Sequence, residues 1–322
     1  TPDQDRVRWS LSFLPLASMT HHPNRDFMTN GTTDDGGHPG EHREANRDSH
    51  TMERIPWRVR IVNLIGVCLP FMGLIAAIWL LWGVAFSWTY LVLLFVMYLI
   101  SGLGITIGYH RYFTHKSFQT SRFMQAVLAI SGSMAFEGSV LQWAAVHRSH
   151  HQHSDDEHDP HSPHTHGAGV WNTIRGMWHA HMGWLFRSRS MPLQKYVVDL
   201  KKDRLITTMS ALFPLWALLG LLVPAVLGGL MTMSWMGVLL GFIWGGLVRV
   251  FFVHHVTWSI NSVCHIWGSR PFNSHDESRN NPIFGVLGLG EGWHNNHHAF
   301  PTSVNVYDKT KHSKIKRKKK KQ

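Results

Sequence analysis

Four long apolar runs dominate the pattern of this chain, and the first three contain no charged residue, whereas the fourth contains Arg249. They lie at about 61–82, 85–108, 205–230 and 234–256. As a helix, each run is long enough to cross the roughly 30 Å hydrocarbon core of a bilayer. We therefore interpret the four runs as transmembrane helices and not as buried core helices of a soluble protein.

The connections between the runs indicate how these helices are arranged. Runs one and two are joined by a very short, nearly uncharged link, and so are runs three and four. Lys and Arg gather at the other ends, for example at Arg58 and Arg60 and at Lys201 and Lys202. The positive-inside rule places those ends in the cytoplasm. We predict an all-α integral membrane protein of two helical hairpins, with its termini and large loops in the cytoplasm.

The segment 121–141 is also apolar, but Gly132 and Gly138 interrupt it. A fifth span here would place the histidines on its two sides across the membrane from one another. We therefore predict an interfacial or re-entrant helix pair.

The two ends of the chain differ in composition from the middle. Residues 1–51 are polar, show no periodicity and are predicted to be disordered. The formal net charge is +11, but the stretch from Pro301 onwards holds nine Lys or Arg against one Asp. The basic charge therefore belongs mainly to the tail and gives no indication of a nucleic-acid-binding domain. We expect one domain at 52–303, followed at 304–322 by a disordered tail that resembles an artificially ended translation.

Histidines gather in three dense clusters beside the predicted cytoplasmic ends. The clusters are HRYFTH with His110 and His115, HRSHH with His147, His150 and His151, and HNNHH with His294, His297 and His298. A further one, His265, follows the fourth run. The spacing i, i+3, i+4 in the second and third clusters places three rings on one helix face. The first pair is five residues apart and is predicted to straddle a helix end.

Imidazole groups at this density indicate a metal site. They suit iron, copper, zinc and nickel, whereas a structural zinc site closes with four ligands. Nine histidines therefore fit two metal ions, and the residues alone leave iron, zinc and copper open. A metal transporter is a weaker interpretation, because transport sites lie near the bilayer midplane and these clusters lie outside the apolar runs. The His-rich stretch 153–166 is interpreted as a solvated loop.

The motifs HRYFTH, HRSHH, NSVCHIWG and GEGWHNNHHAFPTS resemble those of the membrane-bound fatty acid desaturases, of the Δ9, stearoyl-CoA type. The resemblance extends from about Trp57 to Ser303. It implies four transmembrane helices beneath a cytosolic helical cap that holds two irons. The ligands that it implies are His110, His115, His147, His150, His151, His265, His294, His297 and His298. It also implies that Asn261 binds a metal through water.

This resemblance implies an oxidoreductase that uses dioxygen to insert a cis double bond, at the Δ9 position, into a saturated C16–C18 acyl chain. The substrate would be an acyl-CoA or an acyl-lipid. A saturated chain has no polar group near the reacting carbons, so a shaped tunnel must position it. By resemblance, Trp143, Thr257 and Trp258 line a kink in that tunnel.

The sequence has no haem domain, flavin fingerprint or iron–sulfur cysteine motif. We therefore expect an external electron donor, namely a ferredoxin, a rubredoxin or a cytochrome b5, and a location in a bacterial inner membrane. Two alternatives remain. One is a histidine-box hydroxylase of alkanes or fatty acids from the same superfamily, and the other is a non-catalytic metal-binding membrane protein.

Overall fold

The computed structural model describes residues 55–81, 87–187 and 193–303. The predicted disordered N-terminal segment and basic tail therefore lie outside the described residues. Within them, the secondary structure is helical, with two isolated β-bridges that join Asn280 to Ser269 and to Trp293. The helical segments of 8 residues or more, in chain order, are α1 (Trp57–Leu81), α2 (Trp88–Leu103), η1 (Gly104–Thr114), α3 (Arg122–Ser133), α4 (Val140–His153), α5 (Val170–His181), α7 (Arg204–Ala211), α8 (Phe213–Thr232) and α10 (Arg249–Ser262). The short segments are η2 (Gly183–Phe186), η3 (Leu193–Val197), α6 (Val198–Lys201), α9 (Trp235–Gly241), η4 (Phe242–Val248), η5 (Val263–His265), α11 (Pro282–Leu287) and α12 (His294–Ala299).

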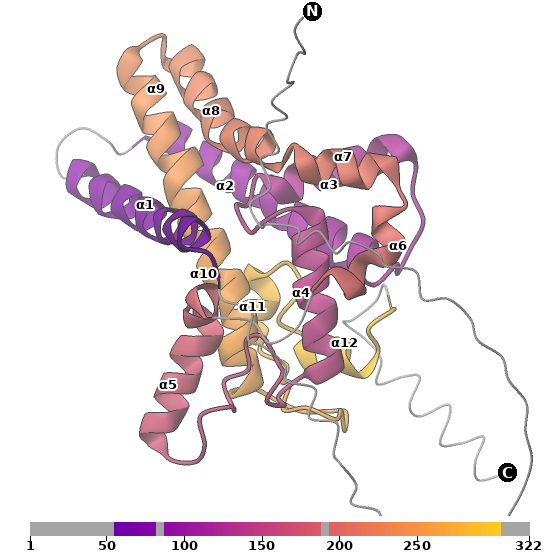
Figure 1. Ribbon diagram of the computed structural model, residues 1–322. Helices are drawn as coiled ribbons and strands as arrows, with labels where there is room; N and C mark the ends of the chain where they lie inside the picture. Colours follow the sequence, from indigo (N-terminus) through magenta and orange to yellow (C-terminus); the bar gives the residue numbers. More distant parts are fainter. Residues whose placement is uncertain (1–54, 82–86, 188–192, 304–322) are drawn as a thin grey trace, which may run out of the picture. The chain divides into compact units, whose positions relative to one another are not determined.

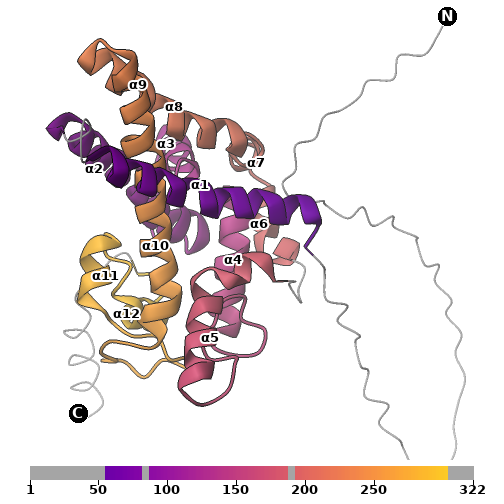
Figure 2. The same ribbon diagram turned by 90° about the vertical axis from the view of Figure 1, so that its left-hand side faces the viewer.

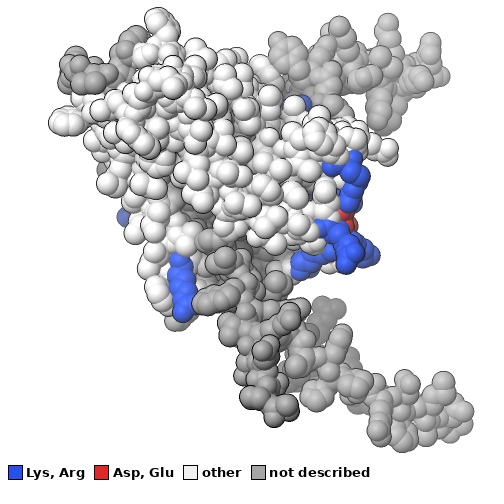
Figure 3. All heavy atoms as spheres, turned by 90° about the horizontal axis from the view of Figure 1, so that it is seen from above, with Lys and Arg blue, Asp and Glu red and all other residues white. Residues whose placement is uncertain are grey.

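Four helices in the described part of the chain are long and apolar enough to cross a membrane, as the sequence predicts. They run over Trp57–Leu80, Trp88–Thr114, Phe213–Thr232 and Trp235–His265. Figures 1 and 2 show that α9, η4 and α10 continue one another along one axis, and α8 packs beside α9. Helix α8 therefore forms a hairpin with the fourth span. In Figure 3, which looks onto the end of the molecule that carries α8 and α9, Lys and Arg appear at the margin of a broad uncharged face.

The predicted third span, 205–230, starts too early. Residues 204–211 form the separate short helix α7, whose N-terminus is capped by Asp203 through a 2.9 Å bond to the Leu205 backbone N–H. Pro214 then stands in the first turn of α8, where its missing N–H costs nothing. Because the cap and the proline each start a helix, the apolar run divides at Leu212.

The prediction for 121–141 is confirmed in its main point. Helix α3 covers Arg122–Ser133 and is too short to span a bilayer, and α4 begins at Val140. Ser121 and Ser139 cap the two helices, each by accepting a backbone N–H three residues later. The second histidine cluster therefore stays on the same side as the first.

Span two ends in an unusual π-helix, η1, which contains His110 and is followed directly by His115 at its C-cap. Its wider turn lets the His115 backbone N–H donate to the His110 carbonyl at 3.1 Å. The ring centroids of this pair are 4.9 Å apart. On an ideal α-helix, residues five apart diverge by about 140°. The π-helix removes that divergence, so both rings serve one site.

A fully buried arginine joins the third and fourth spans to the turn that follows α3. The guanidinium of Arg249 donates to three carbonyl oxygens, those of Gly245 at 3.1 Å, Gly220 at 2.6 Å and Met134. A buried cation is costly unless it is hydrogen-bonded. These bonds tie α8, α10 and the turn after α3 together. That turn leads into α4, which carries the second histidine cluster.

Candidate metal centre

Histidines from all three sequence clusters meet in one group around a common point. His110 and His115 come from the end of span two, His147 and His151 from α4, and His297 from α12. Their ligand nitrogens all lie within 4.8 Å of one another. The Nε2 atom of His297 lies 2.9 Å from that of His110 and 2.8 Å from that of His151. These five histidines are called cluster 1.

The other four predicted ligands form a second group beside the first. His150 comes from α4, His265 from η5, and His294 and His298 from α12. All four are buried, and the Nε2 atoms of His265 and His294 are 3.1 Å apart. These four histidines are called cluster 2. Helices α4 and α12 contribute to both clusters, because their i, i+3, i+4 spacing presents rings to both.

Carboxylates hold the outer ring nitrogens of several of these histidines. His150 Nδ1 lies 3.0 Å from Asp159, and His265 Nδ1 lies 2.9 Å from Asp155. In the same way, His298 pairs with Asp276 and His110 pairs with Glu291. A carboxylate that accepts from Nδ1–H fixes the ring and leaves Nε2 unprotonated and able to bind a metal.

The two asparagines of HNNHH anchor the short helix α12. Asn295 is fully buried, accepts the Phe272 N–H at 2.9 Å and donates to the Phe272 carbonyl at 3.1 Å. Asn296 accepts the side-chain amide of Asn280 at 2.8 Å. Six residues cannot form a stable helix alone. These side-chain bonds, together with the packing around them, hold its three histidines in place.

The electrostatics of the site keep most of the imidazoles neutral. Burial, reinforced by neighbouring histidines, holds the pKa of His147, His151, His294 and His297 well below the usual value. The same causes lower the pKa of His115 to about 2. At His150, burial lowers the pKa, but the carboxylates of Asp159, Asp155 and Asp276 together outweigh burial, and the pKa is raised overall. Neutral imidazoles are the form that binds metal ions.

The chemistry of the donor set fits two metal ions. The Nε2 atoms of His150 and His298 are buried and have no hydrogen-bond partner. A buried polar atom without a partner is costly unless a ligand satisfies it. Both rings direct these atoms into cluster 2 while Asp159 and Asp276 hold the opposite nitrogens. A metal ion bound within the cluster would satisfy both.

The interpretation of 153–166 as a solvated loop is wrong for its central part. Asp159, His161 and Ser162 are all buried. Asp155 accepts the Ser162 hydroxyl at 2.7 Å and the Glu277 backbone N–H at 2.8 Å. The segment is polar because its carboxylates pair with the histidines. His161 also forms a further possible metal-binding group with His150 and Asp159.

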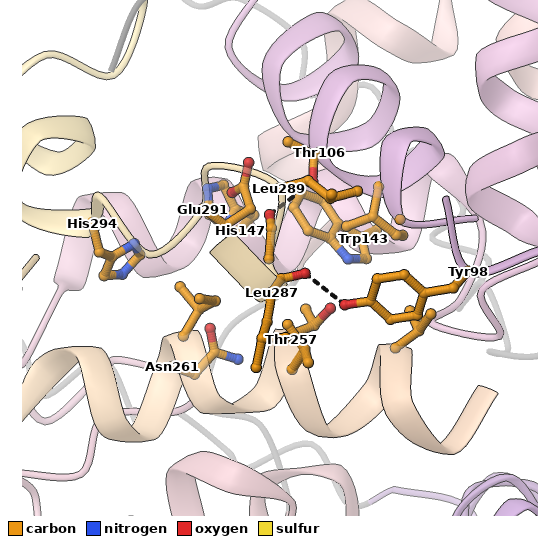
Figure 4. A pocket seen from close by; sticks show the side chains of 16 residues that line it. Tyr98, Thr106, Trp143, His147, Thr257, Asn261, Leu287, Leu289, Glu291 and His294 are labelled. Carbon is orange, nitrogen blue, oxygen red and sulfur yellow. Dashed lines mark hydrogen bonds between the residues drawn. The ribbon is translucent and has the colours of Figure 1, made fainter. Parts of the chain in front are cut away.

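A pocket lies against the two clusters (Figure 4). Apolar side chains of span two and α10 and the segment 287–289 form much of its wall. Trp143, Thr257 and Asn261 line it, together with His147 of cluster 1 and His294 of cluster 2. Trp258 does not appear among its lining residues. Its ring is buried and stacks on His254, with centroids 4.8 Å apart.

Comparison with known proteins identifies the family. The sequence profile for fatty acid desaturases matches residues 85–313. The chain belongs to the fatty acid desaturase family. It is 43% identical over 240 residues to a hex-5-enoyl-[acyl-carrier protein] acetylenase of Moorena producens, covering 74% of this chain and 75% of that one. It is 37% identical to an sn-1 stearoyl-lipid 9-desaturase of Anabaena variabilis, over 68% and 75% of the two chains. It is 33% identical to an sn-2 palmitoyl-lipid 9-desaturase of a Nostoc species, over 76% and 80%.

Sequence reasoning placed the histidines but missed the acids around them. Asp155, Asp159, Asp276 and Glu291 hold the ligand rings, and Glu137 bonds to two predicted tunnel residues. A signal was present for Asp159, which lies only 9 residues after its partner His150. Asp155, Asp276 and Glu291 lie farther in sequence from their partners His265, His298 and His110, and the fold brings these pairs together.

Proposed function

We propose that this desaturase inserts a cis double bond at carbon nine of saturated C16–C18 acyl chains, using dioxygen and two bound irons. The observation that carries this proposal is the position of the pocket. It borders cluster 1 at His147 and cluster 2 at His294, and elsewhere its wall is largely apolar. An acyl chain in this pocket would present its carbons to both clusters. We also propose that residues 52–303 form the desaturase domain.

The nine histidines are the proposed iron ligands. Cluster 1 would supply five of them and cluster 2 four, and Asn261 would bind the second iron through water. Members of the family generally carry two irons, and with dioxygen these supply the strong oxidant that an unactivated C–H bond requires. The imidazole-rich donor set supports iron binding, because Fe²⁺ stands low in the affinity order of divalent metals and a full shell helps to retain it.

The protein's own side chains would determine which carbons react. Trp143 lines the pocket and stacks on His147, with ring centroids 4.9 Å apart and planes 22° apart. Thr257 lines the pocket from α10. We propose that these two residues bend the chain at the metals and that Trp258 supports them from behind. Holding a chain at a fixed distance from the metals converts pocket shape into regioselectivity.

The relatives support more than one acyl carrier. Two are named as acyl-lipid 9-desaturases, which supports position nine and a lipid-linked substrate. The acetylenase is named for a chain on acyl-carrier protein. A second candidate function is therefore the conversion of an existing double bond to a triple bond at the same site. We propose acyl-CoA or acyl-lipid as the substrate and a location in a bacterial inner membrane with the site in the cytoplasm. The proposed electron donor is a ferredoxin, a rubredoxin or a cytochrome b5.

The test is expression in a desaturase-deficient host, followed by gas chromatography of derivatised total lipid. We expect new Δ9 monounsaturated C16 and C18 chains with the wild-type protein and none with His297→Ala. Triple bonds would favour the acetylenase function, and hydroxylated chains the hydroxylase. Purified protein that holds zinc and leaves lipid unchanged would support a non-catalytic metal-binding protein.

A further inference from the structure

An exposed groove with apolar and basic walls lies between α5 and η2. It is lined by Ile174, Arg175, Trp178, Phe186 and Arg187, among others. Trp178 is 63% exposed and Ile174 is 49% exposed, and both arginines are also exposed. Trp and Arg are among the side chains enriched at the centres of protein–protein interfaces. This surface is called the α5 groove.

The exposed apolar surface continues along the helix. On the same helix, Val170 is 75% exposed and Trp171 is 77% exposed. Two large exposed tryptophans within eight residues are unusual for a surface that meets only water. Helix α5 packs on α10 through other residues, such as His181, whose Nε2 atom lies 2.9 Å from His255 Nδ1. The exposed stripe is therefore not needed for packing within the described chain.

The charge of this region has one sign. The sequence from Pro160 to Val198 contains no Asp or Glu, whereas Arg175 and Arg187 border the groove. A surface with basic charge around an apolar centre is complementary to an acidic protein and steers its approach. Such a partner would dock close to the membrane, because the Asn63 side chain of span one donates to the Leu185 carbonyl in η2 at 2.6 Å.

A short series of aromatic rings leads from the groove to cluster 2. Trp184 lies in η2, directly between the groove residues Gly183 and Phe186. Its ring centroid is 5.4 Å from that of His161. The His161 ring is in turn 4.4 Å from that of His150, which belongs to cluster 2. His161 and His150 are also joined through Asp159, which lies 3.0 Å from His150 Nδ1 and accepts the His161 backbone N–H at 3.0 Å.

We propose that the α5 groove is the docking surface for an acidic one-electron carrier protein, and that Trp184 and His161 connect it to His150. The inference rests on the proposed desaturase function, which requires electrons from outside the chain. Charge complementarity selects the partner, and the ring series gives a reason for docking here. An acidic acyl carrier would need the groove to open towards the pocket, but the groove and the pocket share no lining residue.

The electron balance sets how often the carrier must dock. At each docking the carrier would give up one electron, and the iron held by the two clusters would accept it. Reduction of dioxygen to two waters takes four electrons and four protons. The substrate supplies two of each when its two C–H bonds break and the C=C bond forms. Two dockings and two protons from solvent supply the rest.

The first experiment measures carrier binding to the iron-loaded protein in nanodiscs, with an acidic plant-type [2Fe–2S] ferredoxin as the probe. We expect Arg175→Glu combined with Arg187→Glu to raise the Kd for ferredoxin by at least about tenfold. Rising salt concentration should also raise the Kd of the wild type. Lys202→Glu together with Lys201→Glu is the matched control, because both lysines are exposed and lie outside the groove. Its Kd should equal that of the wild type.

The second experiment separates docking from electron delivery. Trp184→Leu removes the indole from the ring series, and Trp184→Phe keeps an aromatic ring. We expect both to retain the wild-type Kd within about twofold, because the exposed groove residues supply the contact. Anaerobic stopped-flow oxidation of reduced ferredoxin should slow at least tenfold in Trp184→Leu and recover substantially in Trp184→Phe. Iron content measured on the same samples shows whether each variant has kept its fold.

Several results would overturn the proposal. Ferredoxin binding that is insensitive both to salt and to the two arginine reversals would do so, even if wild-type lipid desaturation holds. So would a loss of affinity only for an acyl carrier protein, or a change in particle size that marks the groove as a contact between two copies. If the arginine variant loses its iron, the salt dependence of the wild-type Kd and the Trp184 pair decide the question. If the wild type desaturates no lipid at all, the proposed function fails, while the binding measurement still reports on the groove.

Discussion

The indole nitrogen of Trp143 donates a 3.0 Å hydrogen bond to the carboxylate of Glu137. Thr257 bonds to the same carboxylate from α10. One acid thus joins two walls of the pocket that come from different parts of the chain. Burial raises the pKa of Glu137 to about 7, although both hydrogen bonds oppose the rise. Two lining residues of the pocket are therefore bonded to a carboxyl group whose pKa lies near neutral pH.

Stability should fall as this group loses its proton. Because the folded-state pKa is above the ordinary value of 4.5, the folded chain binds the proton more tightly than the unfolded chain does. That contribution is complete below about pH 4.5 and is lost as the pH rises through 7. Between about pH 5 and pH 8, we expect the free energy of unfolding of the wild type to fall by on the order of 1–3 kcal/mol relative to that of Glu137→Gln. Thermal inactivation in nanodiscs across this range is the measurement, and parallel profiles for the two proteins would contradict it.

Removing a ring from either histidine cluster should release metal. We expect His150→Ala and His297→Ala to reduce iron content below half of the wild-type value and to abolish double-bond formation. Each ligand must be neutral to bind, so iron should also be lost on acidification. Elemental analysis of purified protein tests both points. His158→Ala is the control, since this histidine belongs to neither cluster, and unchanged iron in all three variants would show that the clusters do not bind it.

The carboxylates behind the rings should tune metal retention without binding metal themselves. Asp276 pairs with His298 and accepts the Ser278 hydroxyl, and both are buried. Asp276→Asn should weaken metal affinity by roughly 10–100-fold, because an asparagine at this position would no longer fix the orientation and tautomer of the His298 ring. Iron retention during a timed chelator challenge measures this. Asp156→Asn is the matched control, since its partner His153 lies outside the clusters. Equal iron retention in both variants would contradict this prediction.

Close backbone contact at the start of η1 should make Gly104 intolerant of a side chain. A Cβ atom there would lie 2.2 Å from the Gly132 backbone nitrogen, which is closer than atoms can approach. Gly104→Ala must push α3 away, and it should lower the free energy of unfolding by about 1–3 kcal/mol. At Gly66, by contrast, a Cβ atom would meet nothing within 4 Å. The difference in inactivation temperature between Gly104→Ala and Gly66→Ala reports the cost, and equal temperatures would count against this packing.

Much of the fold could be predicted from periodicity and hydropathy. The scarcity of charge predicts the four spans, because a charge in hydrocarbon is expensive unless it is hydrogen-bonded, as Arg249 is. The boundaries were harder to place, because apolar character does not reveal a break such as the one at Leu212. There Asp203 and Pro214 act through capping and a missing N–H. Those signals are local and small compared with the hydropathy of the whole run.

Part of the candidate site could likewise be predicted from the sequence, and part could not. Helical spacing predicts the histidines of α4 and α12, since three rings at i, i+3 and i+4 share a face. It could not predict that His110 and His115 converge, because that depends on the π-helix of η1. Nor could it assign Glu137 to Trp143 and Thr257. That contact depends on how the turn after α3 meets α10, which no local pattern encodes.

The π-helix also constrains how the gene can change. Deleting one residue between His110 and His115 would let the backbone return to ordinary α-helical bonding, which is the more favourable geometry. The same deletion would turn every later residue by about 100° around the helix axis. His115 would then leave cluster 1, and α3 would be attached in a new direction. A deletion that relaxes the helix would therefore disable the enzyme, so the spacing between these two histidines should tolerate substitutions far better than changes in length.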